Sequence, residues 1–209
     1  CLSDWSSDVC SSDLNPYGFR PVNRIDGLPY AGAFRQLPID AAYNTAIYYG
    51  DPVAIVTGGT IAKSSTSGSA ITSAVIAGVF VGCQYVNAQG QTVQAQYYPG
   101  TTVTNAVAYF VDDPMAAYKV AVGYANGVVT TVQQNAVGTN MSYYAGTGST
   151  ITGDAGAWVT AASGANTATL PWRVISVVPD TNVTSTTFCE VIVKINTQQY
   201  NVALANNLA

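Results

Sequence analysis

The segment AVAYFVDDPMAAYKVAVGYANGVVTTVQ, residues 106–133, decides the fold class. It contains three runs rich in β-branched and aromatic residues, which is the composition of strands: 106–111, 118–124 and 127–133. Asp112-Asp113-Pro114 separates the first two runs, with Asp113 placed to cap a turn too short to become a helix. Asn126-Gly127 separates the second and third, and it is the strongest short hairpin signal because a type I′ turn needs positive φ at both central positions. The segment therefore predicts paired strands with little helix.

The same pattern extends along the rest of the chain. Further strands are expected at 46–49, 52–57, 77–86, 92–98, 172–178 and 188–195. Gly58-Gly59 and Ala88-Gln89-Gly90 are expected to form tight turns between strands, whereas 69–77 and 200–208 are weak helical options. These features predict an all-β fold of one or two compact barrel- or sandwich-like units, preceded by an extended N-terminal arm.

We place the first β unit at residues 46–133 and the second at 134–209, with a linking segment near 133–140. An internal repeat with an offset of 95 is one basis for this division. Tyr48-Tyr49 then aligns with Tyr143-Tyr144, 56–58 with 151–153, and 78–81 with 173–176. Chance matches are equally expected in a chain so rich in Thr, Gly and Val.

Residues 15–45 differ in character from the β units. Four prolines, at positions 16, 21, 29 and 38, exclude a central strand in this stretch. The aromatic residues Tyr17, Phe19, Tyr30 and Phe34 are denser than a disordered leader would carry. We therefore predict an extended arm that becomes ordered by packing along something else.

The first fourteen residues, CLSDWSSDVCSSDL, do not match the rest of the chain in composition. They have no basic residue and no apolar run, so they do not fit a signal peptide. Written back into codons, they resemble a common sequencing-library adapter, and we treat 1–14 as a translated artefact. Without their three aspartates the acids fall from eleven to eight against seven bases, which moves the formal charge from −4 to −1. Cys83 and Cys189 remain, and we expect two buried thiols.

The balance of charged residues restricts the class of partner. Charged residues make up 9% of the chain, against roughly 25% in ordinary soluble domains, which favours a component of an assembly. A nearly neutral chain offers no basic stripe for nucleic acid and no polybasic patch for a membrane. No apolar run approaches the roughly 18 residues that a spanning helix needs.

The sequence predicts no catalytic, cofactor-binding or metal-binding residue. The absence of histidine removes Ser-His-Asp and Cys-His catalysis and His-ligated metals. Asp112 and Asp113 are the only adjacent acids, and we expect them to serve the turn rather than general acid–base chemistry. Asp51 and Asp180 also look like turn residues whose carboxylates bind the local backbone.

Several phrases resemble small structural proteins of tailed phages that are encoded among the head genes. They are NPYGFRPV (15–22), GLPYAG (27–32), YGDPV (49–53), GVFVGC (78–83), VDDP (111–114) and EVIVKINTQQY (190–200). This resemblance implies a capsid decoration (cement) protein: a non-catalytic virion protein, assembled in the host bacterial cytoplasm, that stabilises the outer capsid surface. Its implied partners are the major capsid protein and neighbouring copies of itself, without cofactor, nucleic acid or membrane.

In that role the N-terminal arm would lie on the shell. Tyr17 and Phe19 would be anchors, Arg20 and Arg24 would meet shell carboxylates, and Tyr30 and Phe34 would complete the contact. Deleting 15–25 is then expected to abolish capsid association while the β units stay folded.

Two alternatives remain open. One is another virion part, such as a head fibre, tail tube or baseplate subunit. The other is a secreted carbohydrate-binding β-sandwich, which would present a Tyr/Trp platform. An enzyme would need two acids within roughly 5–10 Å in a cleft, and the sequence offers no candidate pair.

Overall fold

The computed structural model describes residues 16–66, 69–100, 103–124, 127–128, 134–160, 165–181 and 189–200. Strands dominate these ranges, and the helix found within them is a single 3₁₀ turn, η2 (Gln134–Ala136). The all-β prediction is therefore confirmed. None of the helices in the described ranges is long and apolar enough to cross a membrane.

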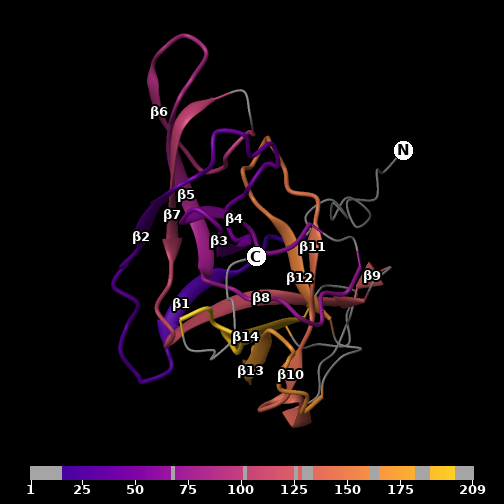
Figure 1. Ribbon diagram of the computed structural model, residues 1–209. Coiled ribbons are helices and arrows are strands. Elements are labelled where there is room, and N and C mark those ends of the chain that lie inside the picture. Colours follow the sequence, from indigo (N-terminus) through magenta and orange to yellow (C-terminus); the bar gives the residue numbers. More distant parts are fainter. Residues whose placement is uncertain are drawn as a thin grey trace, which may run out of the picture.

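Residues 35–111 form a six-stranded sheet (Figure 1). Its order is β2 (Arg35–Pro38), β7 (Thr104–Val111), β5 (Gly78–Val86), β3 (Pro52–Val56) and β4 (Thr60–Lys63), and β6 (Thr92–Ala95) also pairs with β5. The two predicted tight turns are confirmed, because Val56 pairs with Thr60 around the diglycine and Val86 pairs with Thr92 around residues 87–91. The ends of the sheet approach each other where Ile39 bridges to Ile61.

The second sheet has eight strands and is nearly closed, like a barrel. Its order is β10 (Asn140–Met141), β13 (Trp172–Val177), β14 (Glu190–Ile195), β8 (Ala116–Tyr124), β12 (Gly156–Thr160) and β11 (Tyr143–Gly146), and β1 (Arg20–Arg24) and β9 (Gly127–Val128) also pair with β8. Its two end strands, β10 and β11, are separated in the chain by Ser142 alone, so the sheet curls back on itself.

Strand β8 is the centre of this sheet. It pairs antiparallel with β1, β14 and β9, and parallel with β12. The pairing of Tyr124 with Gly127 confirms a hairpin at the predicted place, while Asn126 itself lies outside the described residues. Figure 1 shows β8 as a long band with β13 and β14 below it.

The chain passes from one sheet to the other at residues 112–115. The backbone N–H of Met115 donates to Asp113 Oδ1 at 2.8 Å, and that of Ala116 donates to the Asp113 carbonyl at 3.0 Å. This is the capped turn that Asp113-Pro114 predicts. The chain therefore changes sheets near residue 113, because β8 pairs with β14 and β12, which come later in the chain. The division into two units at residue 133 stays a prediction.

Each sheet encloses its own apolar cluster. The eight-stranded sheet surrounds Trp172, Tyr118, Tyr143 and Phe19, and the six-stranded sheet surrounds residues such as Phe80 and Phe110. Cys83 and Cys189 are free and buried, as expected. Burial raises the pKa of Cys83 to about 12 and that of Cys189 to about 11.

The N-terminal segment is extended, but it packs on the body of its own molecule. β1 adds to β8 and β2 adds to β7, so this one segment contributes a strand to each sheet (Figure 1). The expectation that the arm is ordered only on a partner therefore does not describe this geometry. Ordering costs roughly 1–2 kcal/mol per residue, and the strand pairing and the burial of Phe19 offset that cost.

The structure also bears on two weaker expectations, the helical option at 69–77 and the internal repeat. Residues 69–77 are not helical, because Ile71 bridges to Tyr143 and Ile76 bridges to Gln198. The repeat with an offset of 95 stays a prediction. Its first pair differs in structure, since Tyr48 and Tyr49 lie outside the strands while Tyr143 and Tyr144 belong to β11.

Candidate functional site

The two predicted aromatic anchors, Tyr17 and Phe19, make their contacts with other residues of the same chain. Phe19 has no exposed area, and its ring stacks on Trp172 with 3.9 Å between the centroids. The Tyr17 hydroxyl donates a hydrogen bond to Glu190, and burial together with that carboxylate raises the pKa of Tyr17 well above its ordinary value. Deleting residues 15–25 would take Phe19 out of the core. The β body is therefore not expected to stay folded after that deletion.

The two predicted arginines are paired with acids of their own chain. Arg20 Nη2 lies 2.6 Å from Asp154 Oδ1, and its guanidinium sits 4.1 Å from the ring centroid of Tyr49. Arg24 contacts Asp26 at 2.8 Å and Asp113 at 3.2 Å. Both guanidinium groups therefore already have carboxylate partners within the chain, and a contact with a shell carboxylate would have to replace or share these ion pairs.

Tyr30 and Phe34 belong to the connection between β1 and β2. Tyr30 is half-buried and donates to the Ala33 carbonyl at 2.7 Å, and burial raises its pKa to about 12. Phe34 is 52% exposed, and one side of its ring packs against Tyr109. Leu28, in the same connection, is 57% exposed. Of the six predicted contacts, Phe34 is thus the one that offers an apolar surface to solvent.

Large exposed apolar side chains gather here. Among the described residues four such side chains are exposed, and two of them are Leu28 and Phe34. A third, Tyr200, contacts the first residue of β2: Arg35 Nη1 donates to its hydroxyl at 3.2 Å, and the guanidinium lies 5.1 Å from its ring centroid. We call Leu28, Phe34, Arg35 and Tyr200 the N-terminal patch. In Figure 1 the connection between β1 and β2 projects beyond the sheets at the lower left.

The adjacent acids do not form a catalytic pair. Asp112 contacts Arg35 at 2.8 Å, whereas Asp113 contacts Arg24 and caps the turn. Within the described part of the chain, no cluster of three or more His, Cys, Asp and Glu side chains could hold a metal ion.

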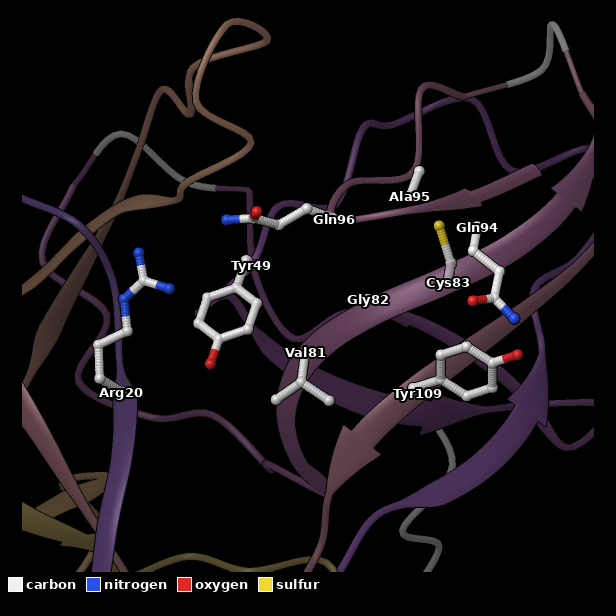
Figure 2. A pocket seen from close by; sticks show the side chains of 9 residues that line it. All are labelled: Arg20, Tyr49, Val81, Gly82, Cys83, Gln94, Ala95, Gln96 and Tyr109. Carbon is white, nitrogen blue, oxygen red and sulfur yellow. The ribbon is translucent and has the colours of Figure 1, made fainter. Parts of the chain in front are cut away.

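An open pocket of about 540 Å³ lies where β1 approaches the six-stranded sheet (Figure 2). It is lined by Arg20, Tyr49, Val81, Gly82, Cys83, Gln94, Ala95, Gln96 and Tyr109. The strand β5 is bulged at this place, since its register against β7 shifts between Phe80 and Gly82. Gly82 has φ +150°, and an added Cβ would come within 3.2 Å of the Ala95 carbonyl oxygen. Bulges often re-aim side chains at binding sites.

The polar groups of the pocket form two separate sets of hydrogen bonds. Asp154 Oδ1 accepts hydrogen bonds from Arg20 at 2.6 Å and from Gln96 Nε2 at 2.8 Å, whereas the Tyr109 hydroxyl donates to Gln84 at 3.2 Å. The Tyr49 hydroxyl and the Gln94 amide make no hydrogen bond to the part of the chain that is described. Figure 2 shows Tyr49 between Arg20 and the strand β5. Gln94 and Tyr109 lie at the other end of the pocket from Arg20.

This arrangement offers groups that can bind a ligand. Cys83 is the one thiol in its lining, and burial keeps that thiol protonated by raising its pKa to about 12. The lining contains no carboxylate or other general base beside it.

Sequence reasoning missed two features. One is this pocket. Gly82, inside the strand predicted at 77–86, was an available signal of the bulge that helps to form it. The other is a buried ion pair, in which Lys63 Nζ lies 3.0 Å from Asp51 Oδ2 with side-chain exposures of 8% and 0%. The expected turn role of Asp51 is real, since the same oxygen accepts the Tyr48 N–H at 2.8 Å.

Comparisons with protein-family models, with curated proteins and with solved structures found no match to this chain. The function is therefore argued from the residues themselves.

Proposed function

We propose that this chain is a non-catalytic structural protein of a tailed-phage virion, a decoration protein that binds the outer capsid surface. The support is the resemblance of its phrases to phage head proteins, together with an all-β body of low charge on which three of the four exposed large apolar side chains of the described residues belong to the N-terminal patch. In this proposal the N-terminal patch, rather than the whole arm, makes the contact with the shell.

The observation that carries the proposal is the grouping of exposed apolar side chains in the N-terminal patch. Leu28, Phe34 and Tyr200 are 57%, 52% and 45% exposed. Leu28 and Phe34 share the connection between β1 and β2, and Tyr200 contacts Arg35 next to Phe34. Exposed apolar side chains that gather on a surface mark interaction sites, and aromatic side chains are the usual anchors of protein interfaces. The one cation there, Arg35, is already paired with Asp112, so the patch suits a partner surface of low charge.

The proposal predicts binding to a preassembled shell. Protein spanning residues 15–209 would be mixed with empty shells assembled from a major capsid protein encoded on the same genome, where sequencing finds one, and the mixture would be separated on a sucrose gradient. We expect the protein to sediment with the shells and to saturate at a fixed ratio. The absence of binding to such shells would overturn the proposal, and so would rings or tubes formed by the purified protein alone, which would indicate a tail component.

A further inference from the structure

We infer that the open pocket beside Arg20 binds an uncharged sugar unit of a glycan. This inference goes beyond the virion role and does not rest on it. It follows from the charge, the hydrogen-bonding groups and the apolar surfaces that the pocket brings together.

The charge of the pocket favours a neutral ligand. Arg20 is the one charged residue in the lining, and Asp154 neutralises it at 2.6 Å. The same carboxylate oxygen also accepts a hydrogen bond from Gln96, and Asp154 itself is not part of the lining. An anion would have to compete with Asp154 for the guanidinium, and a cation would find no free carboxylate in the lining.

The free polar groups match hydroxyls. The Tyr49 hydroxyl and the Gln94 amide can each donate and accept, and Gln96 keeps its carbonyl oxygen as an acceptor after its Nε2 binds Asp154. Sugar hydroxyls also both donate and accept, so they can satisfy such groups in pairs. A hydrocarbon ligand would leave these groups without partners.

The lining also supplies apolar surface for the C–H faces of a sugar ring. The rings of Tyr49 and Tyr109 and the side chains of Val81 and Ala95 surround the opening (Figure 2). The Arg20 guanidinium lies over the Tyr49 ring at 4.1 Å, and Phe34 packs against Tyr109 at 5.3 Å. Both rings are therefore held in place before a ligand arrives, which lowers the entropic cost of binding.

The strand that crosses the pocket, β5, disfavours a peptide that would add to it as a further strand. β5 pairs with both β6 and β7, so it has no free edge here. A peptide that binds as an added strand needs a free edge. The volume of about 540 Å³ falls in the range of roughly 300–1,000 Å³ that small-ligand sites occupy.

The test uses protein spanning residues 15–209 and five neutral probes: maltohexaose, cellohexaose, laminarihexaose, mannohexaose and N-acetylchitohexaose. Inorganic phosphate and heparin serve as anionic probes. Saturation-transfer NMR would detect binding, and calorimetry would give the dissociation constant. We expect at least one neutral glycan to bind and the anionic probes not to bind. Binding by none of the five glycans, or binding of phosphate or heparin as tight as that of the best glycan, would overturn the inference.

Variants then locate the site. Gln94→Ala and Tyr49→Phe should each weaken glycan binding by about three- to tenfold, because each removes hydrogen-bonding groups from the pocket. Gln89→Ala, at the exposed turn between β5 and β6, should bind like the parent protein. Undiminished binding in both pocket variants would refute the assignment. Sedimentation of Gln94→Ala with capsid shells should be unchanged, which separates this test from that of the virion role.

Discussion

The ring of Phe19 lies flat against the indole of Trp172, with 3.9 Å between their centroids and 11° between their planes. Phe19 comes from the N-terminal segment, and Trp172 begins β13. Both side chains have no exposed area, and Tyr118 and Tyr143 meet the indole edge-on at 5.8 and 6.4 Å. The N-terminal segment thus completes the core of the barrel-like sheet.

Phe19→Ala should destabilise the protein by about 3–5 kcal/mol, the usual effect of removing a buried aromatic ring. Urea unfolding followed by tryptophan fluorescence would measure it. Phe34→Ala is the matched control, since Phe34 is 52% exposed, and it should cost less than about 1 kcal/mol. Equal effects of the two substitutions would mean that the N-terminal segment does not belong to the core.

Gly50 governs how closely this segment approaches the body. The Phe19 N–H donates to the Gly50 carbonyl at 2.9 Å, and a Cβ on Gly50 would lie 2.9 Å from the Phe19 nitrogen. Gly50→Ala should therefore cost more than the strain of its φ of +90° alone, which is about 1–2 kcal/mol. In Gly32→Ala an added Cβ meets nothing within 4 Å, so that variant isolates the strain at φ +76°. We expect Gly50→Ala to be the more destabilising of the two by at least about 1 kcal/mol. A Gly50→Ala variant as stable as Gly32→Ala would exclude the close approach.

Local pattern was enough to predict several strands, among them β3, β5, β7, β8, β13 and β14, and the turns beside them, but it missed β4, β11 and β12 and wrongly placed a strand at 46–49. Gly58-Gly59, 88–90 and the capped turn at Asp113 each depend on neighbouring residues, and all three occur where expected. The partners of β8 could not be predicted in the same way. Its position between β1, β14 and β12 depends on which apolar faces meet across the chain, and alternation along one strand does not contain that information.

The candidate site was harder to predict for the same reason. Prolines and aromatics identified residues 15–45 as extended, but the place of Phe19 depends on a cavity beside Trp172 that later strands create. The charges of Arg20 and Arg24 suggested shell contacts, yet Arg20 pairs with Asp154 and Arg24 with Asp113, which are distant in sequence, while Arg24 also pairs with its near neighbour Asp26. The role of Phe34 as a contact stays a prediction; its ring packs against Tyr109 on one side and is 52% exposed.

The buried pair of Asp51 and Lys63 gives a prediction that depends on pH. Burial raises the pKa of Asp51, while Lys63 and the Tyr48 N–H act in the opposite direction. Lys63→Met leaves the carboxylate buried without a countercharge, which should cost about 3–5 kcal/mol near pH 8 and raise the pKa of Asp51 further.

The sign of the pH effect follows from proton linkage. The folded variant holds a proton that the unfolded chain, with an ordinary pKa near 3.8, does not hold. Folding therefore takes up a proton, and the penalty should shrink by up to about 1.4 kcal/mol for each unit that pH falls between those two pKa values. Urea unfolding at pH 8, 6.5 and 5 would measure this. Asp51→Asn combined with Lys63→Met removes both charges and should show no such slope. A penalty that stays constant with pH in Lys63→Met would contradict the buried pair.

The two thiols should be inert in the folded protein. Burial raises the pKa of Cys83 to about 12 and that of Cys189 to about 11, so neither forms an appreciable amount of thiolate at pH 8. With protein spanning residues 15–209, Ellman's reagent should label no thiol in buffer and two in guanidinium chloride. Rapid labelling of one thiol without denaturant would show that β5 or the start of β14 opens in the native state.

The N-terminal patch can be tested apart from the stability of the fold. Leu28→Ser combined with Phe34→Ser removes two exposed apolar side chains, so the free energy of unfolding should change little. Full burial of such a side chain is worth roughly 1.5–3 kcal/mol, and about half of each is exposed in the free protein, so burial against the shell should contribute roughly 0.8–1.5 kcal/mol for each side chain and the double variant should bind more than about tenfold more weakly in the sedimentation assay. Ile151→Ser is the control, because Ile151 is 95% exposed but lies outside the patch, and it should bind normally. Shell binding that survives the double substitution would place the contact elsewhere on the protein, whereas equal loss in both variants would indicate general stickiness of exposed apolar groups.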